Sequence, residues 1–145
     1  MGKNNIISNL KDTDKVKLSY NDKDVEMTIE DFRRESAPYR LYIAKLSQSG
    51  TNAPVATVLE NTLGETVTWS YDAGGSYSAS IPSGFTYAKT SVQFTSGYQN
   101  NPSAKFFCYP YTDDVIYIEC RTGTEVSVPA DDELDFATIE IRVYN

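Results

Sequence analysis

The sequence contains no histidine and only two cysteines, Cys108 and Cys120. Histidine is the commonest general base and the commonest zinc ligand, so its absence excludes Ser-His, Cys-His and HExxH sites. Two cysteines are too few for a disulfide scaffold or for a cysteine-based zinc site within one chain. We therefore expect a protein that is not an enzyme and that holds no cofactor and no metal.

Basic residues are also scarce, because 13 Lys and Arg stand against 20 Asp and Glu, and the net charge is −7. Proteins that bind nucleic acid neutralise its phosphates with basic side chains, so nucleic acid is not an expected partner. No stretch approaches the roughly 20 apolar residues of a membrane span, and residues 1–12 lack the apolar run of a signal peptide. We expect a protein that is made in a cytoplasm and does not bind a membrane.

What the sequence does contain is alternation of apolar and polar residues, the pattern of half-buried strands. The first clear run after residue 38 begins at Tyr39, and its period places Leu41 and Ile43 on one face. We expect that face to be buried. Tyr42 and Ala44 would then point outward.

The remaining runs extend the pattern to the end of the chain. The clearest is a hairpin over residues 65–82, with Gly74 and Gly75 in its turn and Trp69 in the core. A last strand over 136–145 closes the chain. Eight or nine strands at this spacing predict a mainly β protein with an antiparallel β-sandwich, jelly-roll or immunoglobulin-like, over residues 39–145.

Residues 1–38 differ in composition from the rest. Residues 14–29 alternate in two short runs that predict a hairpin, and Thr28 stands before an acidic segment as a helix cap does. A short helix is expected near 29–36, stopped by Pro38. We interpret this small hairpin-plus-helix segment as an attachment segment.

The two cysteines lie in the apolar runs FFCYPY and VIYIEC, symmetrically about Asp114. A turn at residues 112–114 would fold these runs into a hairpin. Directly opposed, Cys108 and Cys120 could form a disulfide. Because no secretion signal is visible, two buried reduced thiols are the preferred interpretation.

Acidic residues gather before the last strand, with a second pair at Asp113 and Asp114. A cluster of carboxylates can bind Ca²⁺, which takes six to eight oxygen ligands. The spacing does not match an EF-hand, so a solvated loop is preferred. With 20 acidic residues, a carboxylate pair for glycoside hydrolysis carries little weight. The cluster consists of Asp131, Asp132, Glu133 and Asp135.

Tyrosine occurs 11 times, and two of these residues, Tyr87 and Tyr98, stand in predicted loops. Their rings would offer a contact surface for a glycan or a protein, since aromatic side chains bury large area at low entropic cost. Ordinary loop packing is the alternative. Trp69, inside an alternating strand, is expected in the core.

Residues 46–85 carry a resemblance to a known sequence type, which extends loosely to the end of the chain. The relevant parts are SGTNAP at 49–54, VLENTLG at 58–64, VTW at 67–69 and a Gly-Tyr hairpin at 75–77. This pattern resembles virion proteins of phages that infect gut Bacteroidetes, including the crAss-like phages. It covers about 50 of the 145 residues and carries no site residue with it.

The resemblance implies a β-rich structural protein located in the virion, a small subunit of head fibres or of the capsid decoration. It would associate with itself as a dimer or trimer and dock on other virion proteins. A carbohydrate-binding module for host-surface glycans is one alternative, and a tail-associated adaptor subunit is another.

Overall fold

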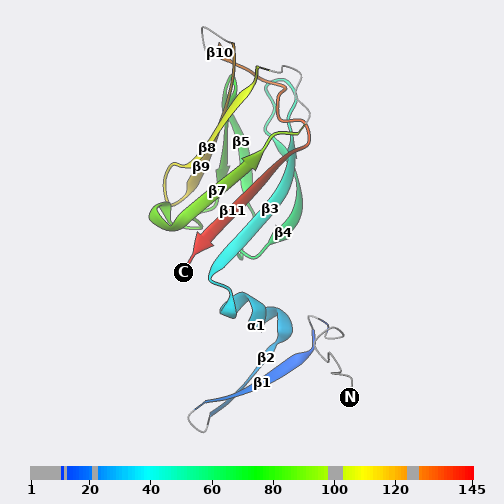
Figure 1. The fold of residues 1–145 in the computed structure, drawn as a ribbon, viewed down its shortest axis with the longest axis vertical. Coiled ribbons are helices and arrows are strands. Elements are labelled where there is room, and N and C mark those ends of the chain that lie inside the picture. The colour runs from blue at the N-terminus through cyan, green and yellow to red at the C-terminus, as the bar shows by residue number, and fades with distance from the viewer. Residues whose placement is uncertain (1–10, 12, 21–22, 98–102, 124–127) are drawn as a thin grey trace, which may run out of the picture. The chain divides into compact units, whose positions relative to one another are not determined.

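The computed structural model describes residues 11, 13–20, 23–97, 103–123 and 128–145. It divides the chain into two compact units, Met1–Pro38 and Tyr39–Asn145, the same bounds that the sequence suggests. Strands dominate both units, and every strand pairing is antiparallel. The prediction of a mainly β, antiparallel fold is confirmed (Figure 1).

The N-terminal unit is a hairpin followed by a helix. Strands β1 (Lys15–Tyr20) and β2 (Lys23–Thr28) pair, and α1 runs over Ile29–Ser36. Thr28 caps the helix, because its Oγ1 accepts the Asp31 N–H at 3.0 Å. In the part of the chain that the structure describes, no helix is long and apolar enough to cross a membrane.

The larger unit consists of two sheets. The first sheet has the strand order β4-β3-β11-β7. The second sheet has the strand order β5-β6-β9-β8, and β10 pairs with the C-terminal end of β9 at Arg121 and Thr122. A short 3₁₀ turn, Tyr87–Lys89, precedes β7. The strands are β3 (Tyr39–Ser47), β4 (Val55–Asn61), β5 (Thr68–Ala73), β6 (Ser76–Ser80), β7 (Thr90–Thr95), β8 (Lys105–Pro110), β9 (Val115–Thr122), β10 (Val128–Pro129) and β11 (Ala137–Tyr144).

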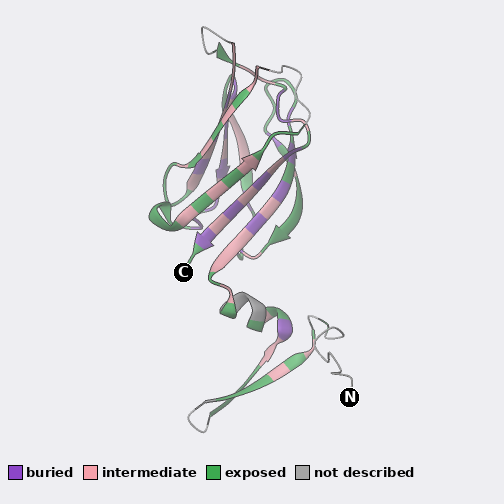
Figure 2. Ribbon diagram, in the orientation of Figure 1, coloured by how far each residue is buried: buried purple, intermediate pink, exposed green. Residues whose placement is uncertain are grey.

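The core lies between these two sheets. Alternate residues of the inner strands are buried, as the banding along β3 and β11 in Figure 2 shows. The alternation predicted for β6 and β11 is confirmed, and Trp69 packs partly buried against the core. The largest fully buried side chains are Tyr42, Tyr77, Phe85, Leu46, Ile81, Ile116, Ile118, Leu134, Ile139, Ile141, Val143 and Cys120.

The predicted face of β3 is wrong. Tyr42 and Ala44 are buried, whereas Leu41 and Ile43 are half-buried on the outer face. The cause is the pairing with β11, in which Ala44 lies opposite the buried Ile139. Directly opposed residues share one face of a sheet, so the inner face of β11 fixes the inner face of β3.

The strand order also narrows the sandwich type. The first strand of the sandwich, β3, pairs with the last, β11. In the constant-type immunoglobulin order these two strands belong to different sheets. The strand order therefore differs from the constant-type immunoglobulin order, and the predicted two-sheet architecture is present.

Candidate functional site

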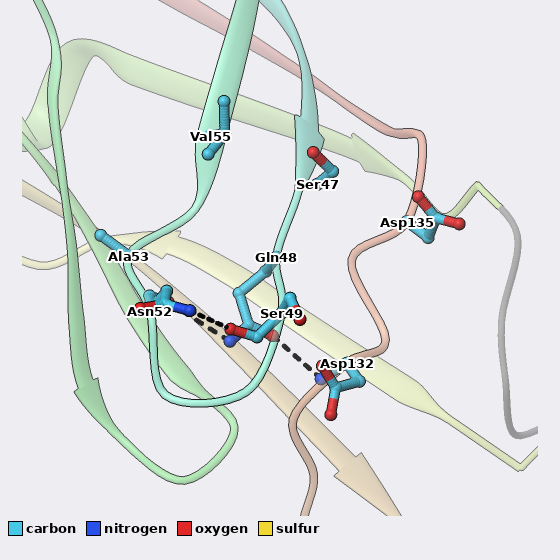
Figure 3. Close-up of a pocket in the computed structure, with 8 residues that line it drawn as sticks. All are labelled: Ser47, Gln48, Ser49, Asn52, Ala53, Val55, Asp132 and Asp135. Atoms are coloured by element: carbon cyan, nitrogen blue, oxygen red, sulfur yellow. Dashed lines mark hydrogen bonds between the residues drawn. The ribbon is translucent and has the colours of Figure 1, made fainter.

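An open pocket of about 530 Å³ lies where two loops meet at one end of the sandwich. One loop follows β3 and contains the SGTNAP segment, and the other is the acidic loop before β11. The structure thus brings together two stretches that the sequence singled out separately (Figure 3). The lining residues are Ser47, Gln48, Ser49, Asn52, Ala53, Val55, Asp132 and Asp135.

Gln48 holds the two loops together. This buried side chain accepts hydrogen bonds at Oε1 from the Tyr77 hydroxyl (3.0 Å) and from the Asp132 N–H (2.9 Å). Its Nε2 donates to the backbone oxygens of Gly50 and Asn52. Both polar atoms of Gln48 are engaged within the protein, so this side chain shapes the pocket instead of presenting a group to a ligand.

Asp131, beside the pocket, is a structural acceptor. Its carboxylate accepts from the Gly75 N–H at 2.7 Å and from the hydroxyls of Tyr77 and Tyr71, each at 3.2 Å. Burial, together with the negative charge of Asp131, raises the pKa of Tyr77 well above its usual value. This network ties β6 to the segment that precedes β11.

The expectation of a solvated acidic loop is therefore wrong for part of the cluster. Asp131 is half-buried in the network just described, and Glu133 is only 5% exposed. The carboxylate of Asp132 accepts the Gly50 N–H at 2.7 Å. Among the described residues, no group of three or more His, Cys, Asp or Glu side chains is placed to hold a metal ion.

Asp113 and Asp114 also accept hydrogen bonds from backbone N–H groups. They occupy the β8–β9 turn, where Asp113 accepts the Tyr87 N–H at 2.6 Å and Asp114 accepts the Ser83 N–H. Their backbone oxygens accept from Phe85 and Ile81. These bonds fasten the turn to the segment between β6 and β7.

Tyr87, one of the two predicted contact residues, lies on this fastened segment. Its side chain is 58% exposed, so it is available for contact at the sandwich surface. Its backbone bond to Asp113 holds it close to the β8–β9 turn. Tyr98 lies outside the described residues.

The two cysteines are not directly opposed, contrary to the predicted symmetry. Tyr111 pairs with Val115 across the turn, so the hairpin is centred on Asp113. Cys108 therefore lies opposite Ile118, and Cys120 opposite Phe106. Diagonal neighbours of this kind are about 7–8 Å apart, too far for a disulfide without backbone movement.

Both thiols are free, Cys120 is fully buried and Cys108 is half-buried. Burial raises the pKa of each thiol to about 12. A thiol that stays protonated at neutral pH is a poor nucleophile and a poor metal ligand. The cysteines therefore behave as small apolar core residues.

The outer face of the β8–β9 hairpin carries a second candidate surface. We call it the aromatic face and define it as Phe107, Tyr109, Tyr111 and Tyr117. Tyr109 and Tyr117 are paired across the strands and stack with ring centroids 6.3 Å apart at 17°. Tyr111 meets Tyr117 edge-on at 5.0 Å. Phe107, Tyr109 and Tyr111 are 48%, 38% and 59% exposed.

Polar side chains continue the aromatic face across the sheet. The Tyr109 hydroxyl donates to Glu119 at 3.2 Å, and Glu119 also pairs with Arg121 at 3.2 Å. Beyond Tyr117 lies Ser78 of β6, whose hydroxyl donates to Asp72 at 3.1 Å. The neighbouring outward positions of β6 and β5 are small hydroxyl side chains, Ser76, Ser80, Ser70 and Thr68.

The sequence analysis missed this surface, although the signal was present. Phe107, Tyr109 and Tyr111 alternate with Phe106, Cys108 and Pro110. In a strand with apolar residues at both parities, one set must face outward. Only the pairing with β9 shows that the tyrosines belong to the outward set.

Comparison of the chain with family models, with curated proteins and with solved structures finds no match. A function is therefore inferred from the two surfaces described above, the N-terminal unit and the resemblance of residues 46–85.

Proposed function

We propose that this chain is a non-enzymatic structural subunit of a phage virion, placed in head fibres or in the capsid decoration. Residues 1–38 would dock on a neighbouring virion protein. One observation carries the proposal. Leu18 and Val25 face each other across the β1–β2 hairpin, and they are 41% and 51% exposed. The resemblance of residues 46–85 to virion proteins supports the same role.

The N-terminal unit offers these side chains little cover of its own. A two-stranded hairpin is at best marginally stable in water, because it buries too little apolar area to offset its chain entropy. Phe32 of α1 is also 39% exposed. Full burial of such side chains stabilises by about 1.5–3 kcal/mol each. A partner that covers all three would stabilise both the segment and the attachment.

The edge strand β4 supports self-association. Within the described residues β4 pairs with β3 and forms one edge of its sheet. Val55, Val58 and Leu59 on this strand are 68%, 51% and 56% exposed. An apolar edge with unpaired backbone groups is a template for pairing with another chain. A second copy of this chain is the proposed occupant, in a dimer or trimer.

Light scattering of the purified protein tests self-association. We expect the full chain and a truncated chain starting at Ala37 to form the same oligomer. Val58→Lys should shift that oligomer toward monomer, because it places a charge on the free edge. Thr95→Lys is the matched control, since it adds the same charge to β7 at the other edge of the sheet. Monomers throughout would contradict self-association.

The place in the particle needs a separate measurement. Mass spectrometry of purified particles should detect this chain if it is a virion protein, and immunogold labelling should place it on the head. Label at the tail would favour a tail-associated adaptor. Absence of the chain from particles of a phage that encodes it would overturn the proposal.

A further inference from the structure

The aromatic face combines two kinds of group that few ligands satisfy together. Its rings offer exposed apolar surface, and the same sheet face holds hydroxyls and carboxylates beside them. Aromatic rings pack against flat apolar surfaces, while hydroxyls and carboxylates bind hydroxyl groups. A sugar ring has both an apolar C–H face and a rim of hydroxyls.

We propose that the aromatic face binds an uncharged, hydroxyl-rich glycan. Sugar rings stack on Tyr109 and Tyr111, and their hydroxyls bond to Glu119, Asp72 and Ser78. This inference is independent of the proposed virion role, because the surface lies within the sandwich and uses no residue of the N-terminal unit.

The charge of the aromatic face favours a glycan over a nucleic acid as its ligand. Base stacking on aromatic rings also occurs in proteins that bind single strands, but there the rings line a positively charged groove. Here Asp72 and Glu119 are offset by Arg121, which pairs with Glu119, and by Lys105, which lies opposite Arg121 on the same outward face. The negative charge of Asp72 raises the pKa of Tyr117, so its field reaches the ring. The aromatic face is therefore not a positively charged groove, and a phosphate or uronate chain would meet no net positive charge on it.

The polarity of the aromatic face favours a glycan over a protein as its ligand. The buried centre of a protein interface is depleted in charged residues. On this surface the tyrosines are interleaved with an ion pair and with the Ser78–Asp72 bond, next to small hydroxyl side chains. A protein would have to desolvate these groups, whereas sugar hydroxyls replace their water.

The exposed rings of the aromatic face extend beyond the length of one sugar ring. Phe107 and Tyr109 occupy alternate positions of β8, about 6.6 Å apart, and Tyr111 follows directly after the end of β8 at Pro110. The exposed rings therefore continue along β8 and into the turn that follows it. The ligand expected is an extended oligosaccharide that spans at least two rings, not a monosaccharide.

Native gels that contain a soluble neutral polysaccharide test the proposal with the full chain. Mannan, xylan and mixed-linkage β-glucan serve as neutral probes, and heparin and oligo-dT as anionic ones. We expect retardation by at least one neutral probe and by neither anionic probe. Tyr109→Ala and Tyr111→Ala should each weaken binding by about tenfold, in line with the energy of aromatic contacts.

Tyr144→Ala is the matched control. Tyr144 is 41% exposed and meets Tyr39 edge-on at the outer face of the other sheet, so its loss should leave glycan binding unchanged. Circular dichroism and thermal melting confirm that each variant is folded. Three outcomes overturn the proposal: no retardation by any neutral probe, retardation that survives the Tyr109→Ala/Tyr111→Ala double variant, or retention of heparin or oligo-dT.

Tyr87→Ala tests whether glycan binding depends on Tyr87, the loop tyrosine that the sequence indicates as a contact residue, instead of on the aromatic face. If Tyr87→Ala alone abolishes binding and the two strand tyrosines do not matter, the site is the loop and the proposal is wrong. If the double variant instead dissolves an oligomer seen by light scattering, the face is a protein interface and the proposal is also wrong.

Discussion

At the scale of single residues, the polar side chains that matter most are those that the fold has turned inward. Asp131 lies in a loop that the sequence predicts to be solvated, yet together with Gln48 it forms the hydrogen-bond network between β6 and the segment before β11. A buried polar group without its partner costs more than the bond contributes, so these residues are sensitive to substitution.

Asp131→Ala should lower the free energy of unfolding by about 1–3 kcal/mol, because it leaves the buried Gly75 N–H without its acceptor and the Tyr77 hydroxyl with Gln48 Oε1 as its remaining one. Urea denaturation followed by Trp69 fluorescence measures the change. Glu65→Ala, at an exposed position, should change stability by less than about 0.5 kcal/mol. Equal effects of the two substitutions would show that the network contributes little.

Cys120 makes stability depend on alkaline pH. Burial raises its pKa from 9.0 to about 12, so between these values the thiol ionises in the unfolded chain but stays protonated in the folded one. The unfolded state then binds fewer protons, and the free energy of unfolding falls by about 1 kcal/mol per pH unit. Tyr77, whose pKa is also raised, acts in the same direction at higher pH.

Urea denaturation at several values between pH 8 and pH 10.5 measures this loss. Cys120→Ala should reduce the slope of stability against pH above pH 9, whatever its effect at pH 7. An unchanged slope would mean that the buried thiol does not contribute.

At the scale of elements, tight turns and close backbone contacts decide where the strands begin. The β5–β6 turn depends on Gly75, which has a φ of +65° and whose oxygen accepts the Cys120 N–H at 2.6 Å. A Cβ at this position would overlap the Cys120 carbonyl oxygen and the Ala130 nitrogen. The turn therefore packs directly on β9 and on the start of the acidic loop.

Gly75→Ala should cost about 3–5 kcal/mol, the sum of left-handed backbone strain and overlap with backbone atoms. Gly64→Ala is the control, because Gly64 has a φ of +92° but nothing within 4 Å of the added Cβ. It should cost only about 1–2 kcal/mol. Thermal melting of both variants gives the comparison, and similar shifts would contradict the close packing at Gly75.

The β8–β9 hairpin shows how one turn sets the surface of a whole element. The loop places Tyr111 opposite Val115, which shifts the centre of the hairpin from Asp114 to Asp113. That shift separates the cysteines and aligns Tyr109 with Tyr117. The sequence symmetry could not decide between these registers, since both keep the apolar residues on the same faces.

At the scale of the whole molecule, the core belongs to the larger unit alone. The main cluster of buried apolar residues extends from Tyr42 to Val143 and includes none of the residues that the structure describes in the first unit. Stability that comes from burial between two sheets should therefore not require the N-terminal segment.

A chain that starts at Ala37 should unfold cooperatively, with a melting temperature within a few degrees of the full chain. Differential scanning calorimetry of the two proteins makes the comparison. A broad or absent transition in the shorter chain would show that residues 1–36 support the sandwich. The predicted division into two units would then be wrong.

The sequence by itself determined the class of the protein and much of its interior. Alternation with clearly polar partners, as in Tyr77, Ala79 and Ile81 against serines, indicated the inner face of β6, and the same reasoning held for β11. Local signals were also sufficient for the first hairpin and for the helix capped by Thr28. These features depend on neighbours within a few residues, which the sequence displays directly.

Only the tertiary structure decided which face of an ambiguous strand is buried. β3 and β8 have apolar residues at both parities, so period alone could not choose between Leu41 and Tyr42, or between Cys108 and Tyr109. For β3 the choice came from pairing with β11, a strand distant in the chain, and for β8 it came from the register of the hairpin with β9, whose inner face packs in the core. The pocket depends on contacts between distant segments and the aromatic face on a hairpin register, and the alternation within one strand specifies neither.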